Sequence, residues 1–85
     1  MEQPVQLDLR GTDLETMKMY LGLLGGVEQP DGRFAGDGWV VHLEPSVHRF
    51  RQWEFPRVIL TFEGEPDEVK EITRRTLVIA SRGGG

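Results

Sequence analysis

The hydrophobic positions of the chain follow two different periods, which predicts a mixture of strands and helices. In residues 4–11, "PVQLDLRG", the apolar side chains alternate with polar ones, and this period of two is typical of a half-buried strand. In residues 11–26, "GTDLETMKMYLGLLGG", the spacing becomes helical. The apolar positions of this second segment are Leu14, Met17, Leu21 and Leu24, with Tyr20 beside them.

The ends of this first helix carry recognisable signals. Thr12 precedes Glu15 by three residues, which is the spacing of a capping box at a helix start. Gly25 and Gly26 follow the last apolar position, and glycine is typical of a helix end. We therefore expect one helix between these signals.

The middle of the chain predicts several antiparallel strands. Turn signals at residues 30–32 and 36–38 separate short strands over residues 27–29, 33–35 and 39–44. After a loop, residues 51–65, "RQWEFPRVILTFEGE", predict a further strand, and Pro56 indicates an edge or a bulge at its start. The side chains expected to face the core from the last two strands are Trp39, Val41, Leu43, Val58, Leu60 and Phe62.

The end of the chain predicts a second helix over residues 66–81. Pro66 suits a first helical turn, and Asp67 and Glu68 complement the positive end of the helix dipole. Residues 76–80, "TLVIA", are β-branched enough that a strand over 76–81 stays an alternative. We expect a single α+β domain over residues 1–82, in the order strand, helix, four antiparallel strands, helix, and a flexible glycine tail over 83–85.

Composition narrows the class of protein. The 85 residues contain no cysteine and carry a net charge of −4, which excludes a disulfide framework and disfavours general nucleic-acid binding. The start of the chain has no apolar run of a secretory signal, and no segment has the roughly 20 apolar residues of a membrane span. We expect a cytoplasmic protein, and the arginine-rich, asparagine-free composition favours a thermophilic or high-GC source.

Catalytic chemistry has little support in the sequence. His42 and His48 are the two imidazoles; His42 shares a strand face with Glu44, but a third metal ligand and a zinc-type spacing are missing. No nucleophile–base arrangement or phosphate-binding loop can be assembled. We expect no enzyme activity, no catalytic residue, no metal site and no cofactor.

A partner-binding surface is the strongest functional candidate from the residues. The segment "HRFRQWEFPR", residues 48–57, interleaves basic and aromatic side chains, and aromatic residues and arginine are typical anchors of interfaces. Basic groups beside aromatic rings also suit a nucleic-acid surface, and arginine pairs with an acidic protein or a phosphorylated small molecule. The structural alternative is that the aromatic rings complete a small core while the arginines pair with nearby acids. The residues predicted to bind a partner are Arg49, Arg51, Trp53, Phe55 and Arg57.

The terminal glycines raise a second hypothesis. A free Gly-Gly end can thread a narrow channel and present its carboxylate for adenylation and sulfur transfer, as in ubiquitin-like sulfur carriers. In those β-grasp proteins the glycines follow a strand, whereas a helix is expected here. The residues of this candidate tail are Arg82, Gly83, Gly84 and Gly85.

Four blocks of the sequence, "YLGLLGG", "DGRFAGDGWVVHLEP", "FPRVILTFEGEPDEV" and "IASRGGG", resemble the C-terminal domain of MoaD-related proteins. In that family a domain of this kind follows a ubiquitin-like domain similar to the small sulfur-carrier subunit of molybdopterin synthase. The resemblance implies a TATA-binding-protein-like, helix-grip fold and an association with molybdopterin or sulfur-transfer pathways. The ubiquitin-like domain is missing from this sequence, which puts direct sulfur carriage in doubt.

Together these features favour a non-enzymatic accessory or interaction module associated with molybdopterin or sulfur-carrier biology. A small-ligand-binding helix-grip domain is the first alternative, and a sulfur carrier that uses the terminal Gly-Gly is the weaker one. We expect a protein partner from a sulfur-transfer or molybdopterin pathway and neither nucleic acid nor a membrane. The sequence leaves a homo-oligomer open.

Overall fold

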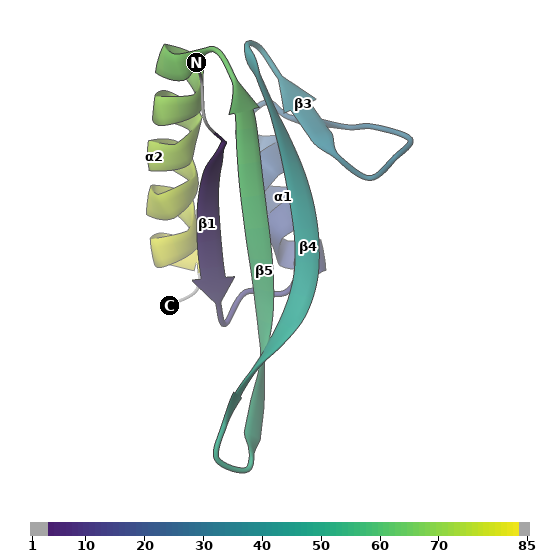
Figure 1. Cartoon of the computed structure of the whole chain (residues 1–85), viewed down its shortest axis with the longest axis vertical. Coiled ribbons are helices and arrows are strands. Elements are labelled where there is room, and N and C mark those ends of the chain that lie inside the picture. The colour runs from purple at the N-terminus through teal and green to yellow at the C-terminus, as the bar shows by residue number, and fades with distance from the viewer. Residues whose placement is uncertain (1–3, 84–85) are drawn as a thin grey trace.

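The computed structural model describes residues 4–83 and has an α+β architecture with one sheet and two helices (Figure 1). The sheet is antiparallel throughout, with the strand order β1-β5-β4-β3-β2. The elements in chain order are β1 (Val5–Arg10), α1 (Leu14–Leu23), β2 (Val27–Glu28), β3 (Phe34–Gly36), β4 (Trp39–Phe50), β5 (Trp53–Gly64) and α2 (Pro66–Gly83). This confirms the predicted α+β order of strand, helix, four strands and helix.

The core lies between one face of the sheet and both helices. Val41, Leu60 and Phe62 of the central strands are fully buried, and α1 adds Met17 and Leu21, which are also fully buried. The alternation predicted for β4 and β5 is therefore confirmed, because the odd positions of β4 and the even positions of β5 face the helices. The opposite face of the sheet is not covered by either helix (Figure 1).

The start of α1 differs from the prediction. Asp13 is the N-cap, and its carboxylate accepts a hydrogen bond of 2.8 Å from the backbone N–H of Thr16. Thr12 is buried one residue earlier, so the predicted capping box of Thr12 and Glu15 is wrong. Aspartate is at least as good an N-cap as threonine, and its charge also favours the helix N-terminus.

The end of α1 follows the prediction. Gly25 has a φ of +98°, a left-handed conformation that glycine adopts without a Cβ penalty. The N–H of Gly26 then donates to the carbonyl of Leu21 at 2.9 Å, as in a Schellman-type helix end.

Residues 76–80 are helical, so the strand alternative for 76–81 is wrong. α2 continues through them to Gly83. Thr76 is fully buried in the helix, and its hydroxyl donates to the carbonyl of Ile72 at 2.7 Å. Ile79 and Ala80 pack against the core on the same side, so tertiary packing outweighs the β propensity of this segment.

The loop predicted between residues 44 and 51 is also wrong. β4 continues to Phe50 and pairs with β5 residue by residue up to Trp53, so only Arg51 and Gln52 connect the two strands. β3 ends its pairing with β4 at Val41, and β1 ends its pairing with β5 at Arg57. Residues 45–57 are therefore a two-stranded extension, here called the arm, which projects beyond both helices (Figure 1).

Candidate partner-binding surface

The arm presents aromatic side chains that take no part in the core. Phe50, Trp53 and Phe55 are 56%, 59% and 43% exposed. Phe50 is paired with Trp53 and His48 with Phe55 across the two strands, so all four side chains lie on the same face. The rings of His48 and Phe55 are tilted with centroids 6.5 Å apart. An exposed aromatic group of this kind is typical of an interaction site.

The five residues predicted to bind a partner do not all lie together. Trp53, Phe55 and Arg57 alternate along β5 and share the aromatic face. Arg49 lies on the opposite face, where it is paired with Glu54. Arg51 lies in the turn at the tip of the arm.

The arginines of the arm differ in how far they are neutralised. Arg57 donates to both carboxylate oxygens of Asp8 on β1, at 2.7 and 2.8 Å. Arg49 lies 3.7 Å from a carboxylate oxygen of Glu54. Arg51 forms no ion pair within the described part of the chain, and its guanidinium carbon lies 5.4 Å from the centroid of the Phe50 ring. Arg51 is therefore the arginine of the arm that keeps its charge available.

The backbone of Arg51 adopts an unusual conformation. Its φ is +59°, and it is the one non-glycine residue of the described chain with a positive φ. The other positive φ values belong to glycines. A left-handed conformation costs a residue with a Cβ roughly 1–2 kcal/mol relative to its ordinary conformation.

Two prolines shape the edges of the arm. The carbonyl of Pro56 accepts a hydrogen bond of 2.7 Å from Gly11, and Gly38 accepts one from Glu65. These bonds and the register of β4 and β5 show which way the backbone groups of the two prolines face. The backbone N and C=O of Pro45 and of Pro56 face away from the paired strand, toward the two outer edges of the arm. Proline has no N–H, so each edge lacks one donor that an added strand would use. The arm is therefore suited to binding through side chains.

Sequence reasoning missed Phe50 as a member of the aromatic face. The reason is the connection Arg51–Gln52, which lacks the Asn-Gly or Asp-Gly signal of a two-residue hairpin. The alternation of His48 and Phe50 with Trp53 and Phe55 about this connection was the available signal.

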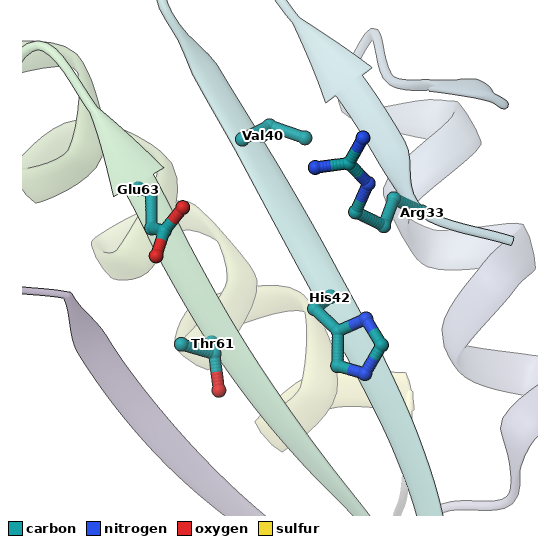
Figure 2. A pocket seen from close by; sticks show the side chains of 5 residues that line it. All are labelled: Arg33, Val40, His42, Thr61 and Glu63. Carbon is teal, nitrogen blue, oxygen red and sulfur yellow. The ribbon is translucent and has the colours of Figure 1, made fainter. Parts of the chain in front are cut away.

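The uncovered face of the sheet has a second, smaller feature. A hollow of about 210 Å³ is lined by Arg33, Val40, His42, Thr61 and Glu63 (Figure 2). Arg33 is already paired with Asp31 at 2.8 Å. Within residues 4–83, no three His, Cys, Asp or Glu side chains lie close enough together to hold a metal ion.

The ion pair between Asp8 and Arg57 joins the base of the arm to β1. Hydrogen bonds from Arg57 lower the pKa of the Asp8 carboxyl below its usual value, and the same contacts raise the pKa of Arg57. Because the pKa of Asp8 is lower in the folded chain than in the unfolded one, the pair stabilises the fold at neutral pH. This contribution is lost as the pH falls through the folded-state pKa.

We therefore expect the free energy of unfolding of Asp8→Asn to fall less between neutral and acidic pH than that of the wild type. The measurement is urea unfolding of the wild type and the variant at a series of pH values from 7 downward. Asp37→Asn is the matched control, because Asp37 forms no ion pair with any residue in the described range. An unchanged pH dependence in Asp8→Asn would contradict a stabilising role of the pair.

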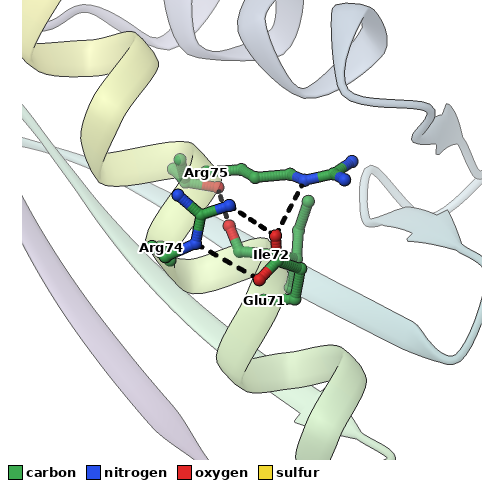
Figure 3. A network of polar contacts seen from close by, with 5 residues as sticks. Glu71, Ile72, Arg74 and Arg75 are labelled. Atoms are coloured by element: carbon green, nitrogen blue, oxygen red, sulfur yellow. Dashed lines mark hydrogen bonds and ion pairs between the residues drawn. The ribbon is translucent and has the colours of Figure 1, made fainter.

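The exposed side of α2 carries a separate charged group. Glu71 pairs with Arg74 and with Arg75, one turn further along the same helix (Figure 3). Hydrogen bonds from Arg74 are the main cause of a lowered pKa of the Glu71 carboxyl. Pairs at these spacings support the helix itself, so we assign this group a structural role.

Comparison with known families supports the relation to MoaD-type proteins that the sequence indicates. The family model described as "Archaeal MoaD-like protein" matches residues 5–85. The chain belongs to this family. No curated protein matches the sequence significantly.

The family match includes the terminal glycines, and the structure describes part of that segment. Arg82 is exposed in the last turn of α2, and the helix ends at Gly83. Gly84 and Gly85 lie outside the described residues. In this MoaD-like chain, a helix and not a strand therefore precedes the terminal glycines of the sequence.

None of the helices between residues 4 and 83 is long and apolar enough to cross a membrane.

Proposed function

We propose that this protein is a non-enzymatic interaction module of molybdopterin or sulfur-carrier biology, which binds a partner protein through the aromatic face of the arm. The observation that carries the proposal is the exposure of Phe50, Trp53 and Phe55 on a two-stranded extension outside the core. Membership of the MoaD-like family supports the link to the pathway.

The position of these side chains argues for binding and against a purely structural role. Removing large aromatic side chains from water is a main source of folding free energy, yet here about half of the surface of three of them stays exposed. A two-stranded hairpin is also marginally stable when it has no further layer packed on it. The exposed aromatic surface of the arm therefore lowers the stability of the free protein, which is understandable if a partner covers that surface.

The alternatives receive less support. A ligand-binding domain calls for a pocket of about 300–1,000 Å³, whereas two hollows lined by described residues, one on the open sheet face and one beside α2, measure about 210 and 50 Å³. A sulfur carrier of the ubiquitin-like kind calls for glycines after a strand, and here α2 precedes them. We further propose that the fold is of the helix-grip type and corresponds to the domain that follows the ubiquitin-like domain in fused relatives.

Trp53→Ala tests this function. The probes are the purified sulfur-activating enzyme and the large subunit of molybdopterin synthase of the same host, with binding measured by calorimetry. We expect the wild type to bind one of them and the variant to bind about 30-fold more weakly, since truncating a central anchor costs about 2 kcal/mol. The midpoint of thermal unfolding should stay close to that of the wild type, because Trp53 is outside the core.

Met19→Ala is the matched control, because Met19 is 55% exposed but lies on α1, away from the arm. It should bind like the wild type. If neither probe binds the wild type, the proposed pathway is wrong; if Trp53→Ala binds as tightly as the wild type, the proposed surface is wrong.

A further inference from the structure

The tip of the arm contains a residue that does not suit its backbone conformation. Arg51 has a φ of +59°, whereas the chain uses glycine at its other positive-φ positions: Gly11, Gly25, Gly32, Gly38 and Gly64. Glycine at position 51 would relieve the strain without altering the connection between β4 and β5. A strained non-glycine residue in an exposed turn points to a role for its side chain.

The guanidinium of Arg51 is placed where a partner can reach it. It lies 5.4 Å from the centroid of the exposed Phe50 ring, next to the pair of Phe50 and Trp53. Arg57 is bound to Asp8 and Arg49 lies near Glu54. The aromatic face thus ends in one available guanidinium, which can pair in two-pronged fashion with a carboxylate.

The distribution of charge restricts the kind of partner. The arm contains three arginines and one glutamate, which give it a net charge of +2. The net charge of the whole chain is −4, so the residues outside the arm have a net charge of −6. A nucleic acid or an anionic membrane would attract the tip and repel the body, and nucleic-acid binding usually draws on several free cations. A single carboxylate needs only one guanidinium, which is what the arm offers.

We propose that Arg51 is the specificity-determining contact of the arm and pairs with a carboxylate beside an apolar recess on a partner protein. The recess receives the rings of Phe50 and Trp53, and the carboxylate takes the two-pronged contact from Arg51. This inference rests on the proposed function only in that the arm is the docking element. The identity of the pathway does not enter it.

The partner is first located by a photo-crosslinking benzophenone amino acid in place of Gln52, in the full chain expressed in its native host. We expect a protein adduct whose crosslinked peptide, sequenced by mass spectrometry, lies beside an Asp or Glu. The adduct should be lost when Arg51→Gly is added to the crosslinking chain. Failure to form a specific protein adduct, with retention of the chain on phosphatidylglycerol vesicles or on single-stranded oligonucleotides, would overturn the proposal.

The identified partner is then purified and its affinity measured against three variants. We expect Arg51→Gly to bind about 10- to 100-fold more weakly while its midpoint of unfolding stays level or rises. Arg51→Lys should lie between it and the wild type, because lysine keeps the charge but not the two-pronged geometry. Lys70→Ala, which removes an exposed positive charge on α2, should bind like the wild type.

The outcomes separate this inference from the proposed function. If Arg51→Gly binds as tightly as the wild type, Arg51 is not the specificity-determining contact, whatever the partner is. If the partner lies outside molybdopterin and sulfur-transfer chemistry but Arg51→Gly weakens its binding, the inference holds and the proposed pathway fails.

Discussion

Phe62→Ala is expected to lower the free energy of unfolding by about 3–5 kcal/mol. Phe62 is fully buried in the centre of the sheet, between Val5 of β1 and Val41 of β4. Its ring also packs against Trp39, with the centroids 6.3 Å apart. Truncation removes buried apolar surface and leaves a cavity. The cavity cannot collapse, because the backbone of β1 and β4 lies on either side of it. Urea unfolding followed by far-UV circular dichroism measures the loss.

Phe50→Ala is the matched control, because it removes the same side chain from the exposed end of the arm. We expect it to change the free energy of unfolding by no more than about 0.5 kcal/mol. Equal losses in the two variants would mean that the arm packs as part of the core. That result would also remove the main support for the proposed function.

Gly64→Ala is expected to be comparably severe, with a loss of at least about 3 kcal/mol in the free energy of unfolding. Gly64 has a φ of +141°, and a Cβ placed there would lie 2.3 Å from the carbonyl oxygen of Gly38 and 2.9 Å from the Cα of Trp39. These are backbone atoms of Trp39 at the start of β4 and of the residue before it, so no side-chain rotation relieves the clash. Backbone strain and overpacking then add. Thermal and urea unfolding both report the change.

Gly32→Ala separates strain from the clash. Gly32 also has a positive φ, +92°, but an added Cβ would meet no atom within 4 Å. We expect a loss of about 1–2 kcal/mol from strain alone. A loss as large as that of Gly64→Ala would mean that the close approach of β4 and β5 is not the cause.

The core was largely predictable from the sequence because its signals are local. The period of two in β4 and β5 distinguishes the buried Val41 and Leu60 from their outward neighbours, and the register of the sheet preserves that division. The helix over residues 66–81 was also predicted, although "TLVIA" alone favours a strand. Packing of Ile72 and Thr76 against the core decides this segment, and such packing cannot be read from propensity.

The candidate site was predicted by residue type but not by geometry. The chain pairs β4 with β5 well beyond the point where either has another neighbour, whereas the segment around Pro45 was predicted to be a loop. The edge position indicated by Pro56 is confirmed, but only the register reveals that Pro45 also lies on an outer edge, where strands tolerate proline. The division of Arg49, Arg51 and Trp53 between two faces and a turn depends on that register.

The outward placement of Pro45 and Pro56 has a consequence for the behaviour of the protein at high concentration. A long hairpin with exposed aromatic rings and two open edges can grow by edge-to-edge addition of strands. Each proline breaks the row of donors that such growth requires, one on each side of the hairpin. Growth by edge-to-edge addition of strands is therefore disfavoured at both sides of the hairpin, while its aromatic face stays exposed for a partner.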